Sequence, residues 1–82
     1  MIRVLLFANL RELAGTNQLD VDADGISCIA DLLARIKHDH PALESSLDDE
    51  SAMISVNQKY ATREAALQEG DEVGILPPVS GG

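Results

Sequence analysis

Few basic residues and a single cysteine narrow the chemistry open to this 82-residue chain. Lysine and arginine total 6 against 14 aspartate and glutamate residues, so the formal net charge is −8. Such a charge repels phosphate backbones, and we therefore expect no nucleic-acid partner. It suits docking onto a basic protein surface, or it simply keeps a small domain soluble. Because Cys28 stands alone, an internal disulfide and a four-cysteine iron–sulfur site are excluded.

Several other motifs are missing. No apolar run approaches the roughly 20 residues that span a bilayer, and the first residues lack the pattern of a secretion signal, so we expect a cytoplasmic protein with no membrane segment. Neither GxxxxGK[ST] nor GxGxxG after a strand occurs, which predicts no nucleotide site and no cofactor bound by this chain. His38 and His40 do not share a helix face, and residues 48–50 lack the spacing of a calcium loop, so we expect no metal. The sequence shows no pairing of a nucleophile with a base, so we do not expect the chain to be an enzyme on its own.

The hydrophobic pattern predicts one α+β domain over residues 1–76. Strands are expected at residues 2–8, 17–23, 52–57 and 72–76, with the first two antiparallel. The main helix is expected at residues 27–40, with Ser27 as its N-cap, and a second short helix within residues 42–50. Helical turns are expected at residues 10–15, closed by Gly15, and at residues 62–67, with Leu67 as the anchor. This order resembles a ubiquitin-like β-grasp, in which a mixed sheet carries one main helix on one face.

The first and last strands place apolar residues on both faces. One helix covers only one face of a sheet, yet Leu5 and Phe7 alternate with the apolar positions 2, 4 and 6. In the last strand, Val73 and Ile75 oppose Leu76. Apolar residues on the uncovered face predict a docking patch for a partner, unless loops and short helices bury them.

Residues 77–82, PPVSGG, form an extended tail in this interpretation. Pro77 and Pro78 end the last strand, and the four residues that follow can reach about 13 Å at about 3.3 Å per residue. Gly81 and Gly82 have no Cβ and fit a channel too narrow for side chains. The terminal carboxylate is ionised and a poor electrophile, so it needs activation, for example as an acyl adenylate formed in a partner's ATP site. A sulfur nucleophile can then displace AMP. The alternative is a frayed terminus that happens to end in glycine.

Three segments, FANLRELAG, VNQKYA and GDEVGILPPVSGG, resemble the MoaD/ThiS family of ubiquitin-like sulfur carriers, and the small subunits of molybdopterin synthase in particular. The resemblance implies that an E1-like enzyme of the MoeB type uses ATP to adenylate Gly82. A persulfide sulfur donor then converts it to a thiocarboxylate. In a complex of two small and two large subunits, the tail enters the large subunit, of the MoaE type, and donates sulfur to cyclic pyranopterin monophosphate.

On this view Gly81 and Gly82 are functional residues, and the large subunit supplies the catalytic residues of the synthase. The partner-binding residues that the resemblance and the pattern together predict are Phe7, Leu5, Ile75, Pro77, Pro78 and Val79. The family often has aromatic residues just before the prolines, where this chain has Ile75 and Leu76. Two alternatives use the same adenylated glycine: a ubiquitin-like modifier joined to lysines, and a carrier that feeds thiamine thiazole synthesis or tRNA thiolation.

Overall fold

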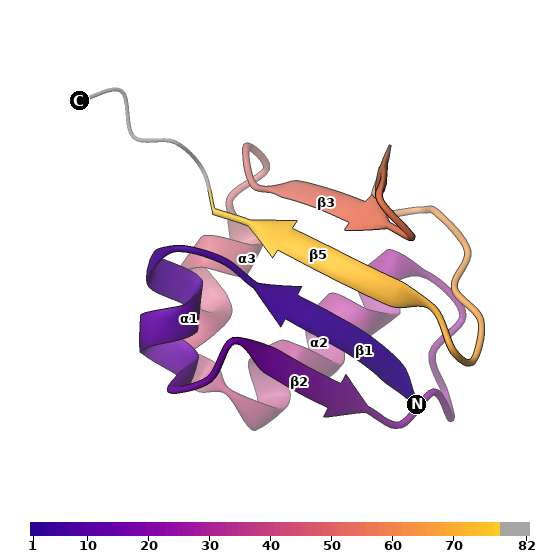
Figure 1. Ribbon diagram of the computed structural model, residues 1–82, viewed down its shortest axis with the longest axis horizontal. Coiled ribbons are helices and arrows are strands. Elements are labelled where there is room, and N and C mark those ends of the chain that lie inside the picture. The colour runs from indigo at the N-terminus through magenta and orange to yellow at the C-terminus, as the bar shows by residue number, and fades with distance from the viewer. Residues whose placement is uncertain (78–82) are drawn as a thin grey trace.

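A mixed sheet with the strand order β2-β1-β5-β3-β4 is the frame of the computed structural model, which describes residues 1–77. Within these residues the sheet has five strands, and Figure 1 shows the helices on one side of it. The elements in chain order are β1 (Ile2–Leu6), α1 (Asn9–Ala14), β2 (Gln18–Val21), α2 (Ile29–Asp39), the 3₁₀ turn η1 (Pro41–Leu43), α3 (Glu44–Asp48), β3 (Met53–Val56), β4 (Lys59–Ala61) and β5 (Glu72–Leu76).

The last strand, β5, lies at the centre of the sheet. It pairs in parallel with β1, with Leu6 opposite Ile75, and antiparallel with β3, with Met53 opposite Leu76. As predicted, β1 and β2 are antiparallel. Between them, α1 ends at Gly15 in the left-handed conformation that a glycine adopts without strain (φ 75°). The expected helix–sheet arrangement of a β-grasp is confirmed, and β5 ends at Leu76, where the sequence places the end of the domain.

The core lies between the sheet and α2. Residues at helical spacing on α2 are buried against the sheet residues that alternate toward it. Removing each such leucine or isoleucine side chain from water contributes about 1.5–3 kcal/mol to folding. Pro41 follows the end of α2 and starts η1, and the predicted second short helix is α3. The buried core on the helix side comprises Leu10, Ile29, Leu32, Leu33, Ile36, Leu43 and Leu47, and on the sheet side Ile2, Val4, Leu6, Val21, Ile54, Val73 and Ile75.

Residues 62–65 form a single turn, in which the N–H of Ala65 donates to the carbonyl of Thr62 at 3.1 Å, and the chain does not continue as a helix. The same segment pairs with the start of α2: the carbonyl of Ala65 accepts the N–H of Ile29 at 3.0 Å, and the N–H of Leu67 donates to the carbonyl of Ser27 at 3.0 Å. The first of these two bonds satisfies an N–H group that a helix start leaves without a partner. Leu67 is buried, so its role as an anchor is confirmed.

The start of α2 differs from the prediction for the same reason. Cys28, half-buried, occupies the N-cap position without a side-chain cap, and Ser27 precedes it. The N–H and O–H of Ser27 donate to the carboxylate of Asp31 at 3.0 and 2.9 Å. These two hydrogen bonds stabilise the charged carboxylate and lower the pKa of Asp31 below its ordinary value.

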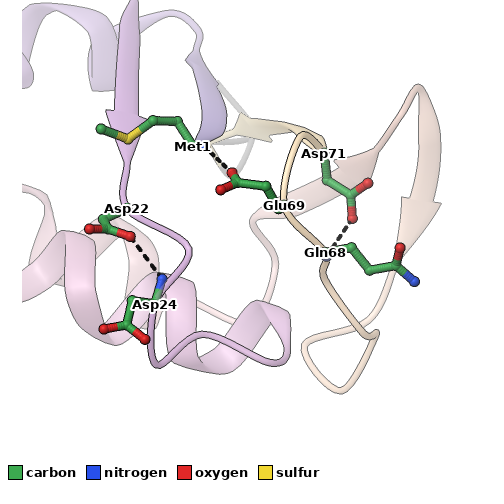
Figure 2. A network of polar contacts seen from close by, with 6 residues as sticks. All are labelled: Met1, Asp22, Asp24, Gln68, Glu69 and Asp71. Atoms are coloured by element: carbon green, nitrogen blue, oxygen red, sulfur yellow. Dashed lines mark hydrogen bonds and ion pairs between the residues drawn. The ribbon is translucent and has the colours of Figure 1, made fainter.

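Polar contacts hold the loop before β5 to the start of β1. Figure 2 shows the terminal ammonium of Met1 paired with the carboxylate of Glu69, and the carboxylate of Asp71 accepting the backbone N–H of Gln68 at 2.8 Å. The N–H of Gly70 also donates to the carbonyl of Met1 at 3.2 Å. The figure also shows the backbone N–H of Asp24 donating to Asp22 at 2.9 Å, in the turn between β2 and α2. These contacts therefore hold the beginnings of β1 and β5 together.

Candidate functional site

The face of the sheet opposite α2, here called the outer face, is divided into a charged half and an apolar half. At the beginning of β1 and β5, the guanidinium of Arg3 lies 3.6 Å from the carboxylate of Glu72, and Asp20 is opposite Arg3 in the register. Toward the ends of the same strands the side chains become apolar. The apolar patch, as we define it, consists of Leu5, Phe7, Met53, Tyr60 and Leu76.

Three members of the apolar patch form a row across the sheet. Phe7, Leu76 and Met53 are 43%, 36% and 46% exposed. Leu76 is opposite Met53 in the register, and Phe7 follows β1 immediately after the Leu6–Ile75 pair. Solvated side chains of this size, gathered on one face, are typical of a surface that contacts another protein. Phe7, exposed, and Leu5, half-buried, therefore lie on the uncovered face as the alternation predicts.

Gly74 lies beneath the ring of Phe7. A Cβ atom on this glycine would be 3.5 Å from Cε2 of Phe7 and 2.7 Å from Oγ of Ser55. The first distance is an ordinary van der Waals contact, so the ring of Phe7 leaves room for a Cβ at this position. The second is too short, so a side chain at position 74 would require the hydroxyl of Ser55 to move.

The expectation that Ile75 belongs to the docking surface is wrong. Its side chain is 0% exposed and points to the helix side of the sheet, between Leu6 on β1 and Ile54 on β3. Leu76 takes the outward position instead. Met53 was missed in the sequence analysis, because its place beside Leu76 follows from the pairing of β3 with β5, which no local pattern indicates.

The tail is described only at its first residue. Pro77 is half-buried and follows β5 directly, so the chain leaves the sheet beside Leu76 and the apolar patch. Pro78, Val79, Gly81 and Gly82, which were predicted as tail and partner-binding residues, lie outside the described residues.

The remaining polar groups are explained by local structure. Within residues 1–77 no three His, Cys, Asp or Glu side chains gather as a metal site, and no helix of this part is long and apolar enough to cross a membrane.

Hydrogen bonds from Ser51, with a smaller contribution from the charge of Arg63, lower the pKa of Asp49. Arg63 itself donates to the carbonyl oxygens of Leu47 and Asp49 at 2.8 and 2.9 Å, at the C-terminal end of α3.

Comparisons with known proteins place this geometry in context. The model of the ThiS family matches residues 4–82. A protein of Chlamydomonas reinhardtii named molybdopterin synthase sulfur carrier subunit is 42% identical, over 99% of this chain and 98% of the relative. Small archaeal modifier protein 1 of Haloferax volcanii is also 42% identical, over 94% of this chain and 95% of the relative. The crystal structure of SAMP1 from Haloferax volcanii superposes with a TM-score of 0.87 at 37% identity, covering 99% of this chain and 98% of that chain.

Proposed function

The chain belongs to the ThiS family, and we propose that it is the sulfur carrier subunit of a molybdopterin synthase, with sulfur carried as a thiocarboxylate on Gly82. The observation that carries the proposal is the extent of the family match, which includes β5 and runs through the tail to residue 82. The Chlamydomonas reinhardtii relative, whose name states this role, aligns over 98% of its own length.

The chemistry at the terminal carboxylate proceeds in three steps: adenylation, attack by a persulfide and cleavage of an S–S bond. A carboxylate oxygen of Gly82 attacks the α-phosphorus of ATP in the site of an adenylating enzyme of the MoeB type, and pyrophosphate leaves. The terminal sulfur of a persulfide then attacks the acyl carbon and AMP leaves, and a thiol cleaves the resulting S–S bond to release the thiocarboxylate. A thiocarboxylate sulfur is a far better nucleophile toward carbon than the oxygen it replaces. In the synthase, this sulfur forms a C–S bond with cyclic pyranopterin monophosphate, held by a large subunit of the MoaE type, and an oxygen substituent leaves the attacked carbon. Hydrolysis of the resulting thioester leaves the sulfur on the acceptor and returns the carboxylate of Gly82.

The outer face supports this proposal because it presents a docking surface next to the start of the tail. Phe7, Leu76 and Met53 offer an apolar row that a large subunit covers, and Pro77 directly follows Leu76, the middle residue of that row. Apolar burial at the centre of an interface supplies most of its binding energy. The net charge of −8 increases the rate of encounter with a basic partner surface.

A second candidate is a protein modifier, and one observation favours it. The Haloferax volcanii relative, 42% identical, is named small archaeal modifier protein 1. Both functions begin with adenylation of the terminal glycine and differ in the nucleophile that follows. A sulfur nucleophile leaves a thiocarboxylate, whereas a lysine amine of another protein forms an isopeptide bond.

Intact-protein mass spectrometry tests the proposal. The full chain is incubated with ATP, an adenylating enzyme of the MoeB type and a persulfide donor, and the variant lacking Gly82 is the control. We expect a mass gain of one sulfur in place of one oxygen, mapped to Gly82, and sulfur transfer to the pterin precursor when the large subunit is added. Conjugates of high mass that require the diglycine, without a thiocarboxylate, would favour the modifier. Rescue of a thiazole or tRNA thiolation defect, but not of a strain lacking the molybdopterin carrier, would assign a different sulfur acceptor.

A further inference from the structure

Ala8, which directly follows Phe7, is one of three non-glycine residues with positive φ among residues 1–77. Ala8 has φ 53° and ψ −131°, a combination that glycine adopts readily and that costs an L-residue free energy. The carbonyl of Phe7 accepts the N–H of Leu10 at 3.2 Å, which closes a tight turn around Ala8. Leu6 before this turn and Leu10 after it are buried, so both ends of the turn are fixed in the core.

We propose that Ala8 is a positioning residue of the docking surface, whose strained turn holds the ring of Phe7 over Gly74 in the orientation that a partner protein meets. The inference rests on the proposed function, because it concerns the surface through which the carrier reaches its large subunit. At positive φ an L-residue favours only the small left-handed region near ψ of about 30–60°, and Ala8 lies outside it, whereas glycine occupies this part of conformational space readily. The methyl group of Ala8 therefore restricts the backbone from which the Phe7 side chain extends.

The side chain of Phe7 is also positioned by its contact with the sheet. Its ring lies over Gly74, with Cε2 3.5 Å from where a Cβ of that residue would be, and 43% of Phe7 remains exposed. The backbone is thus constrained by Ala8 and the ring by the sheet, while the upper surface stays available. An aromatic anchor that is ordered before binding loses less conformational entropy in the complex, so its preorganisation strengthens binding.

The substitution Ala8→Gly separates positioning from stability. Relief of the strained turn outweighs the extra freedom of glycine in the unfolded chain, so we expect the melting temperature to rise by about 4–8 °C. The same substitution widens the range of Phe7 orientations. We expect the dissociation constant for the purified large subunit to increase about 3–10-fold, and the NMR order parameter of the Phe7 ring to fall in the free protein. A residue with a purely structural role would not move stability and affinity in opposite directions.

Gln58 offers a matched control. It also has positive φ (72°), in the turn between β3 and β4, near the start of β5 and far along the sheet from Phe7. Gln58→Gly is expected to raise the melting temperature as well, but to leave affinity and Phe7 order unchanged. The inference is overturned if Ala8→Gly alters neither affinity nor ring order, or if Gln58→Gly weakens binding equally. Should the unmodified chain fail to bind the large subunit, the proposed function fails, while the ring order in the free proteins still decides the role of Ala8.

Discussion

Adding one methyl group at Gly74 is a direct test of how the outer face is packed. The new Cβ would lie 2.7 Å from Oγ of Ser55, so the serine side chain must rotate or the strands must shift. Overpacking of this kind typically costs about 1–3 kcal/mol. Alanine in a strand interior is favoured over glycine by about 0.5–1 kcal/mol, which offsets part of this cost. We therefore expect Gly74→Ala to lower the free energy of unfolding by about 1 kcal/mol.

In the second half of the test, the same substitution is expected to increase stability instead of lowering it. Ser55→Ala removes the oxygen that the new methyl group would meet, while Cε2 of Phe7 at 3.5 Å tolerates it. In the Ser55→Ala background, Gly74→Ala should then raise the free energy of unfolding by about 0.5 kcal/mol. The four proteins of this double-mutant cycle are compared by urea denaturation followed by far-UV circular dichroism. An equal loss of stability in both backgrounds would refute the steric explanation, and so would a gain in the unmodified background.

Four further substitutions test other parts of the structure. Ile75→Ala should lower the free energy of unfolding by about 2–5 kcal/mol, whereas Leu76→Ala should cost less than about 1 kcal/mol but weaken binding to the large subunit, as measured by denaturation and calorimetry. Arg63→Lys should cost about 1–2 kcal/mol in denaturation experiments, because an ammonium cannot donate to both carbonyl oxygens at the end of α3 in the fixed geometry of a guanidinium. The folded-state pKa of Asp31 is lowered, so its carboxylate stabilises the fold fully above pH about 4 and loses this effect as the pH falls through the folded-state pKa. Asp31→Asn should therefore lower the melting temperature at pH 7, and this difference should shrink as the pH falls below about 4.

The parts of the fold that the sequence predicts well are those set by neighbouring residues. The stripe of Ile29, Leu32, Leu33 and Ile36 indicates α2 because residues three and four apart share one face of a helix. Gly15 marks the end of α1 because its conformation is left-handed. The outward placement of Leu5 and Phe7 follows from the alternation of side chains in a strand.

The errors arise where distant segments decide the outcome. Ile75 and Leu76 are adjacent and both apolar, so alternation shows that they face opposite sides without showing which side the helix covers. The Leu6–Ile75 pairing decides it. The segment from Thr62 to Leu67 makes only one turn, because its carbonyl and N–H groups also pair with the start of α2. The same contact removes the need for a side-chain cap at Ser27.

The parallel pairing of β1 and β5 has a mechanical consequence. Because both strands run in the same direction at the centre of the sheet, Met1 and Pro77 lie at opposite ends of it. A force that pulls on Pro77 while the start of the chain is held acts along the strands, so it loads the hydrogen bonds between β1 and β5 in shear. These bonds must break together rather than one after another, and β3 braces β5 on its other side. The rate of unfolding decides how long a folded domain withstands a pulling force. Tension applied to the tail should therefore increase the unfolding rate of this domain only slightly.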